Sequence, residues 1–255
     1  MVLCVDIGNT DIAIGGFEGD ELQFVTRVST DASKTAQEYE SIVHQLISRK
    51  GVAKADVDGA IISSVVPVLS SVMHDVMNAL YGVCAIHVSL KIDTGIEVVC
   101  DDPSSVGADL ICACVAARYL HGTPSLIIEM GTATKMMVVN DEGRFIGVSI
   151  MAGVMMSMKA LSSGTAQLPQ FSLDAPACAI GTNTIDCMKS GAVFGHAAMI
   201  DGMIDRINEE FGEELSVYAT GGMAASVIPL CRHGITVDEH LVLKGLNILY
   251  RKNKS

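Results

Sequence analysis

Residues 2–16 read VLCVDIGNTDIAIGG, and this stretch decides the fold class. Two short apolar runs flank the turn residues Gly8 and Asn9, which is typical of a β-hairpin. A third apolar run at residues 21–28 extends the hairpin to a three-stranded meander. From Tyr39 onward the apolar positions recur every three to four residues, which predicts an amphipathic helix. Strand patterns that alternate with helix patterns indicate an α/β fold.

The same layout returns in the second half of the chain. A second meander is predicted at residues 125–130, 134–140 and 145–150. Other strands are predicted at residues 59–65, 84–90 and 214–219, and helices at residues 67–81, 104–120, 184–211 and 238–250. Glu129 stands 123 residues after Asp6, at the same place in its strand. We therefore expect two duplicated domains, residues 1–117 and 118–255, each with a mixed sheet that begins with a meander and is flanked by helices.

The composition excludes several classes of protein. Of the 255 residues, 49% are hydrophobic and 18% charged, which excludes disorder and coiled coil as descriptions of the whole chain. The formal net charge of −12 argues against sequence-independent binding to nucleic acid or to an anionic membrane. We find no signal peptide and no membrane-spanning stretch, and the eight cysteines lie mostly in apolar runs. We therefore expect a cytoplasmic protein with a small-molecule partner.

Three loops carry residues suited to phosphate. In residues 6–10, Asp6 ends a buried strand beside a turn that offers backbone N–H and hydroxyl groups, which suits phosphate bound with Mg²⁺. Residues 129–134 repeat this arrangement, with Glu129 as the acid. In residues 220–222 two glycines follow a strand and precede a helix, which allows a ligand to approach the backbone. Ordinary turns are the alternative for each loop taken alone.

Other enzyme classes lack their motifs. The sequence contains no H-E-x-x-H, no G-x-S-x-G and no G-x-x-x-x-G-K-[ST] motif. A metallohydrolase, a serine hydrolase and a P-loop enzyme are therefore excluded. The seven histidines are scattered along the chain with no paired spacing typical of metal ligands.

Seven segments, in order, resemble the type III pantothenate kinases. They are VLCVDIGNTDIAIG at 2–15, DDPSSVGADL at 101–110, IIEMGTAT at 127–134, GTAQLPQF at 164–171, IGTNTIDCMKSGAVFG at 180–195, ATGG at 219–222 and HLVLKGL at 240–246. The resemblance implies the ATPase fold shared by actin, hexokinase and the acetate and sugar kinases. It also implies ATP-dependent phosphorylation of pantothenate to 4′-phosphopantothenate, the first step of coenzyme A biosynthesis. A homodimer, Mg²⁺ and a monovalent cation, K⁺ or NH₄⁺, are further implications.

The resemblance also assigns roles to residues of this chain. ATP and phosphate binding falls to Asp6, Ile7, Gly8, Asn9, Thr10, Asp11, Ile12, Ala13, Gly131, Thr132, Gly221 and Gly222. Substrate binding falls to Cys100, Gly107, Ala108, Asp109, Leu110 and Thr184. Asp109 would be the catalytic base, Asp6 would hold Mg²⁺ through water, and Glu129 would bind the monovalent cation. Without the resemblance, the preferred interpretation of Asp109 is an acid in the first turn of a helix, where the helix dipole favours it.

The dimer interface is expected on one apolar helix. That helix contains Ala192, Val193, Phe194, Ala197, Ala198 and Met199.

The sequence departs from the family around the substrate. Leu110 stands where the family has an Arg that helps to hold pantothenate, and Cys100 replaces a tyrosine. Glu129 replaces an Asp, and Lys135 replaces a Thr. Lys135 could neutralise phosphate, substitute for the cation or be a surface lysine. The run at residues 147–153 has lost a Gly and a Pro of the family pattern.

These departures leave three functions open. Pantothenate phosphorylation with weakened activity is the first, because the acids and the glycine loops are retained. The second is a kinase of the same fold for another small hydroxyl compound. The third is a non-catalytic, regulatory paralogue that binds nucleotide or a pantothenate-like ligand.

Overall fold

The computed structural model describes residues 1–165, 169 and 171–254. The chain forms two compact units, of which unit 1 comprises Met1–His121 with Leu241–Ser255 and unit 2 comprises Gly122–His240. The division after residue 121 differs from the expected boundary at residue 117. The C-terminal helix, which was expected in the second domain, belongs to unit 1. Part of the GTAQLPQF run, residues 166–168 and 170, lies outside the described residues.

Unit 1 contains the predicted meander. Its strands are β1 (Val2–Ile7), β2 (Asp11–Glu18), β3 (Glu21–Ser29), β4 (Gly59–Ser64) and β5 (Ile86–His87), in the order β3-β2-β1-β4-β5. The meander strands are antiparallel, whereas β4 runs parallel to both β1 and β5. A parallel pair requires a crossover connection, and α1 and α2 provide these connections in the chain.

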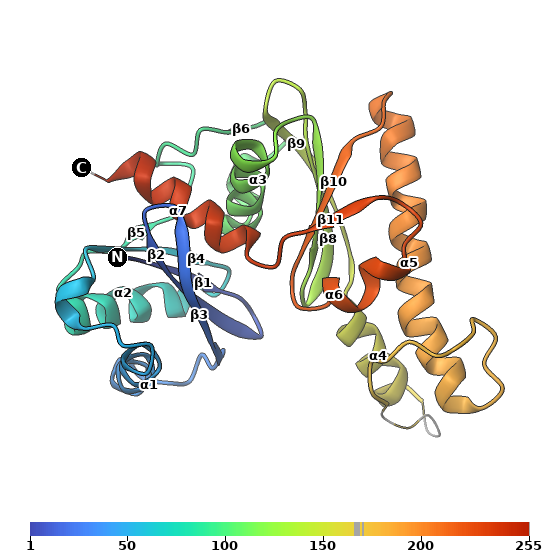
Figure 1. Cartoon of the computed structure of the whole chain (residues 1–255), viewed down its shortest axis with the longest axis horizontal. Helices are drawn as coiled ribbons and strands as arrows, with labels where there is room; N and C mark the ends of the chain where they lie inside the picture. The colour runs from blue at the N-terminus through green and yellow to red at the C-terminus, as the bar shows by residue number, and fades with distance from the viewer. Residues whose placement is uncertain (166–168, 170, 255) are drawn as a thin grey trace. The chain divides into compact units, whose positions relative to one another are not determined.

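Helices cover both faces of this sheet (Figure 1). They are α1 (Ala36–Ser48), α2 (Pro67–Tyr81), α3 (Ala108–Leu120) and α7 (Leu241–Asn253). Alternate residues of β1, Leu3, Val5 and Ile7, share a buried apolar cluster with residues of α1 and α2. On the other face, α7 packs against α3, β1 and β4. The short segments Lys54–Asp56 and Pro103–Ser105 are 3₁₀ turns, and β6 is Glu97–Val98.

Unit 2 repeats the topology of unit 1. Its strands β7 (Ser125–Met130), β8 (Ala133–Val139), β9 (Arg144–Ala152), β10 (Ser216–Thr220) and β11 (Ile235–Val237) lie in the order β11-β10-β7-β8-β9. Again an antiparallel meander is followed by two parallel strands. The predicted duplication is therefore confirmed, and the fold is the two-domain ATPase fold of actin and hexokinase.

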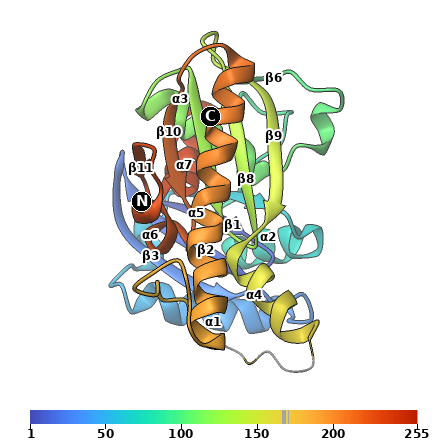
Figure 2. The same ribbon diagram turned by 90° about the vertical axis from the view of Figure 1, so that its right-hand side faces the viewer.

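Helices α4 (Val154–Ser163), α5 (Thr184–Phe211) and α6 (Ala224–Val227) pack on one face of the unit 2 sheet, and the 3₁₀ turn Ile228–Leu230 follows α6. Figure 2 shows α5 running along this sheet with α4 beside its lower end. Ala192 and Ala197 of α5 are buried in the unit's own apolar cluster, and Val193 is also buried. Three of the six residues expected at a dimer interface are therefore covered within the chain itself.

Several predicted boundaries differ from the structure. The strand expected at 84–90 is only Ile86–His87. The helix expected from residue 104 begins at Ala108, because Asp102 caps the preceding 3₁₀ turn by accepting a hydrogen bond from the Ser104 N–H at 3.0 Å. Helix α4 was not predicted. No helix in the described part of the chain is long and apolar enough to cross a membrane.

The contact between α3 and α7 requires a glycine. A Cβ atom on Gly245 of α7 would lie 1.9 Å from the carbonyl oxygen of Cys112 on α3. The two helices therefore approach backbone to backbone at this point. This contact explains why the C-terminal helix belongs to unit 1.

We predict that Gly245→Ala lowers the free energy of unfolding by about 1–3 kcal/mol, because the added methyl group forces α7 away from α3. Gly202→Ala is the matched control, since Gly202 also lies in a helix but has open space around its Cα. The control should gain up to about 1 kcal/mol from helix propensity. Urea unfolding followed by circular dichroism measures both. Equal effects of the two substitutions would contradict the close approach.

Candidate functional site

The first predicted phosphate loop is the β1–β2 turn of unit 1. Asp6 lies near the end of β1, opposite Ala13 on β2 and Ser63 on β4. The Gly8 N–H donates to the Asp11 carbonyl at 3.0 Å, and the Thr30 hydroxyl donates to the Gly8 carbonyl at 2.7 Å. These bonds hold the turn in one shape. Asn9 and Thr10 at its tip are exposed.

The side chain of Asp11 is already paired. Its Oδ2 lies 2.6 Å from Nη1 of Arg27 on the neighbouring strand β3, and both side chains are about half exposed. A free carboxylate here would repel a phosphate, whereas the Arg27 guanidinium balances its charge. Asp11 would therefore contribute to phosphate binding through its backbone. Ile12 and Ala13 are buried in the sheet, so they can only support the loop.

Asp109 lies in the first turn of α3, and only 7% of it is exposed. Its Oδ1 accepts a hydrogen bond from the Leu110 N–H at 2.9 Å. A Cβ atom on the N-cap residue Gly107 would lie 2.4 Å from the same oxygen. The glycine therefore makes room for the carboxylate, and Gly107 and Asp109 form one structural unit.

Asp6 and Asp109 both act electrostatically on the thiol of Cys112. This cysteine lies on α3 and is fully buried. Burial raises the pKa of the Cys112 thiol well above its usual value, and the negative charges of Asp6 and Asp109 raise it further. Both carboxylates therefore lie within electrostatic range of one thiol, although they are about a hundred residues apart in the sequence. The hydroxyl of Ser63 on β4 is buried and has no hydrogen-bond partner.

Sequence reasoning missed Ser63 and Cys112. Both lie in apolar runs, so the pattern predicted only core packing for them. A signal was nevertheless present, because Ser63 is a polar residue in the middle of the buried strand β4.

The predicted substrate residues have different surroundings. In unit 1, Leu110 is buried with 6% of its surface exposed, and Cys100 is half-buried. Ala108 begins α3. Thr184 belongs to unit 2, where it is the exposed first residue of α5, directly after the N-cap residue Asn183.

The second predicted phosphate loop is the β7–β8 turn of unit 2. Three backbone segments meet at this turn. A Cβ atom on Gly153, which precedes α4, would lie 2.4 Å from the Thr132 carbonyl oxygen and 2.6 Å from that of Gly131. A Cβ atom on Gly221 would lie 2.6 Å from the carbonyl oxygen of Met130, and Gly221 has a φ of +98°. Thr132 and Gly222 are exposed, so this junction presents backbone and a hydroxyl to a ligand.

Glu129 and Lys135 form an ion pair beside this loop. They lie directly opposite each other on β7 and β8, and the Lys135 Nζ is 2.9 Å from the Glu129 Oε2. Only 20% of the Lys135 side chain and 17% of the Glu129 side chain are exposed. Lys135 is therefore not a freely solvated surface lysine. On the other side, Thr220 of β10 lies opposite Glu129.

Comparisons with known proteins agree with this fold. The sequence model of the type III pantothenate kinase family matches residues 2–206, which is most of the chain. A Campylobacter jejuni protein assigned to the Baf family of transcriptional activators has a similar structure, with a TM-score of 0.62, 17% identity, and coverage of 98% of this chain and 97% of that one.

Two further solved structures are similar. The activator of the 2-hydroxyisocaproyl-CoA dehydratase from Clostridium difficile, solved with bound ADPNP, has a TM-score of 0.53 and 12% identity over 98% of this chain and 93% of that one. The inorganic polyphosphate/ATP-glucomannokinase from Arthrobacter sp. strain KM has a TM-score of 0.51 and 15% identity over 97% and 96%. At these identities the structural likeness shows the fold alone.

The surroundings of Cys112 predict its reactivity. Because the thiolate is the reactive form, a buried cysteine with a raised pKa should be inert. We expect iodoacetamide at pH 8 to modify the exposed Cys84, Cys178 and Cys187 in the folded protein, and Cys112 only after denaturation. Mass spectrometry of tryptic peptides measures the order of modification. Labelling of Cys112 as fast as that of Cys84 would contradict the burial of Cys112.

Proposed function

Because the chain belongs to the type III pantothenate kinase family, we propose that it transfers the γ-phosphoryl group of ATP to the hydroxyl of pantothenate. Family and fold together make it an ATP-using phosphotransferase. The family match carries the finer proposal, together with the buried Asp109 in the first turn of α3 and Asp6 near the end of β1. Phosphoryl transfer needs a cation-binding acid and a proton acceptor in one place, and unit 1 supplies both.

The proposed reaction uses Asp109 as the base. The substrate hydroxyl gives its proton to the Asp109 carboxylate, its oxygen forms a bond to the γ-phosphorus, and the bond between that phosphorus and the β-phosphate oxygen breaks to release ADP. Gly107 leaves the space in which the carboxylate stands. In unit 1, the backbone of residues 6–13 would hold the phosphates.

The residues present fit a magnesium ion. Mg²⁺ prefers oxygen ligands, keeps several waters and is often held by one or two carboxylates together with substrate phosphates. Asp6 offers such a carboxylate at a strand end. Among the described residues no group of three or more His, Cys, Asp or Glu gathers for a metal ion. When bound, Mg²⁺ neutralises charge on the phosphates.

The residues at Glu129 do not fit a potassium or ammonium ion. The Lys135 ammonium already occupies a position 2.9 Å from the Glu129 carboxylate. A K⁺ or NH₄⁺ ion there would compete with the Lys135 ammonium for the Glu129 carboxylate and would be repelled by its positive charge. We propose that Lys135 supplies the positive charge beside the second loop, so that no monovalent cation is needed.

The proposed substrate side is weaker than that of the family. Leu110 is buried and cannot donate a hydrogen bond to the pantothenate carboxylate. Loss of one charge-assisted hydrogen bond costs about 1.5–3 kcal/mol, or roughly ten- to a hundredfold in affinity. Another small hydroxyl compound as the acceptor therefore stays an alternative. A regulatory role is the other alternative, and the similar Campylobacter protein is described as a transcriptional activator.

A homodimer in a reducing cytoplasm is the last part of the proposal. All eight cysteines are free. Because Ala192, Val193 and Ala197 are buried within the chain, a partner would contact other apolar residues of unit 2. Met155 and Met156 on α4 are about half exposed and offer such a surface. Light scattering after size-exclusion chromatography measures the molecular mass.

We predict that Asp109→Asn lowers kcat by about 10²–10⁴-fold, because the amide cannot accept the hydroxyl proton. The measurement is ADP release from MgATP and pantothenate. Asp141→Asn is the matched control, since Asp141 lies in the exposed β8–β9 turn. Both variants should keep the circular dichroism spectrum of the original protein.

The outcomes separate the open functions. Turnover that requires pantothenate and Asp109 supports the proposal. ATP binding without turnover on pantothenate, but with turnover on another hydroxyl compound, would show that this compound is the acceptor. Nucleotide binding that is indifferent to Asp109, with no turnover on any acceptor, supports the regulatory alternative.

We predict that turnover is the same in K⁺, NH₄⁺, Na⁺ or choline salts. Lys135→Thr should lower turnover in choline about tenfold or more, because the largely buried Glu129 loses its partner. Added K⁺ should then restore part of the activity. Lys135→Met is the control, because it fills the space without providing an oxygen ligand for K⁺. A strict requirement of the original protein for K⁺ would contradict the proposed role of Lys135.

A further inference from the structure

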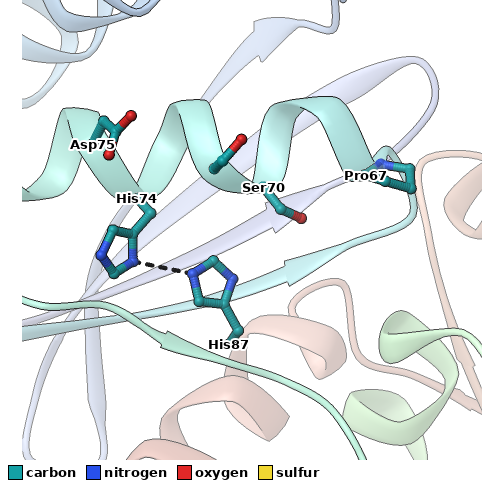
Figure 3. Close-up of a pocket in the computed structure, with 6 residues that line it drawn as sticks. Pro67, Ser70, His74, Asp75 and His87 are labelled. Atoms are coloured by element: carbon teal, nitrogen blue, oxygen red, sulfur yellow. Dashed lines mark hydrogen bonds between the residues drawn. The ribbon is translucent and has the colours of Figure 1, made fainter.

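A hollow of about 410 Å³ lies between α2 and β5 in unit 1. It is lined by Pro67, Ser70, Ser71, His74, Asp75 and His87. Figure 3 shows the rings of His74 and His87 facing each other across it. The His74 Nδ1 lies 3.0 Å from the His87 Nε2, and the ring planes differ by 22°. The fold thus pairs two histidines that are 13 residues apart in the sequence.

The two rings share one proton. A hydrogen bond between two imidazole nitrogens needs one nitrogen with a proton and one with a lone pair. Burial and the charge of His74 lower the pKa of His87, because a second positive charge at 3.0 Å is unfavourable. The lowered pKa favours the neutral form of His87. Neutral imidazole is the form that binds metal ions.

We propose that His74 and His87 bind a divalent transition-metal ion through the two facing nitrogens. Imidazole is a preferred ligand of Zn²⁺, Cu²⁺ and Ni²⁺. On binding, the proton between the rings moves through solvent to the outer nitrogen of the ring that carried it. Both rings then remain neutral and each directs a lone pair to the ion.

The separation of the nitrogens suits one ion. Metal–imidazole bonds are about 2.0–2.1 Å long, so two such nitrogens lie about 2.9 Å apart at a right angle and about 3.3 Å apart in a tetrahedron. The observed 3.0 Å is within this range. Each ring must tilt so that its lone pair points at the ion rather than at the other ring. His87 is exposed on the two-residue edge strand β5, so its side chain has room to turn.

The rest of the hollow favours a cation with open coordination positions. The Asp75 carboxylate lines it and adds negative charge, although Figure 3 shows Asp75 pointing away from His87. Ser70 lies one turn before His74 on the same side of α2 (Figure 3). Because no third His, Cys, Asp or Glu joins the pair within the described residues, water or a small ligand would fill the other positions. The bound ion would link α2 to the edge of the sheet.

Titration calorimetry with Ni²⁺ tests the proposal. Ni²⁺ is chosen because it prefers imidazole, whereas Zn²⁺ also binds the thiols of exposed cysteines. The full chain is used after removal of any histidine tag. We expect one Ni²⁺ per chain, and at least tenfold weaker binding for both His74→Ala and His87→Ala. His44→Ala should bind as the original protein does, because His44 is an exposed histidine on α1 of the same unit.

Three results would overturn the proposal: no saturable binding, binding that survives His87→Ala, or equal weakening by His44→Ala. Because His87 is exposed, its variant tests the site even if His74→Ala impairs folding. Thermal unfolding gives a second readout, since Ni²⁺ should raise the Tm of the original protein and not that of His87→Ala. The test is independent of kinase activity.

Discussion

The packing of α3 against β4 is the interaction on which the candidate site of unit 1 depends. It places the N-terminal turn of α3, which carries Asp109, beside the chain that follows β4, since a Cβ atom on Gly107 would lie 3.7 Å from the Val65 side chain. Asp6 lies on β1, the strand paired with β4. Gly245 allows the backbone of α7 to pack closely against the backbone of α3, and this contact holds α3 in position. Because helix and strands come from distant parts of the chain, the two carboxylates exist as a pair only in the folded protein.

The equivalent loop of unit 2, between β7 and β8, has different surroundings. There the loop after β7 is enclosed by backbone, since Gly153 and Gly221 approach its carbonyl groups more closely than any side chain would permit. The acid at the strand end is paired with Lys135 instead of being available to a metal ion. The duplicated topology thus carries two chemically distinct loops, one with an acid suited to a hydrated cation and one with its own fixed cation.

The His74–His87 pair shows how the same sheet can hold chemistry on its other side. Helix α2 packs on the face of the sheet opposite α3, and β5 is the edge strand of this sheet. The ring of His74 on α2 therefore meets the ring of His87 on β5 at the edge of the sheet. Neither histidine is part of the buried core, because His74 is half-buried and His87 is exposed. Their hydrogen bond is instead a polar contact between α2 and β5.

The sequence by itself determined the two meanders, the duplication, most helices and the positions of the β1–β2 and β7–β8 turns. These features depend on local periodicity and turn residues, which act over a few residues. It also led to the proposal of Asp6, Asp109 and Glu129 as site residues and to the expected loss of a donor at Leu110. Only the tertiary structure decided that residues 241–253 join the first unit, that Lys135 pairs with Glu129, and that His74 meets His87. Such contacts join residues across strands and helices, and their formation depends on packing distances that no local pattern encodes.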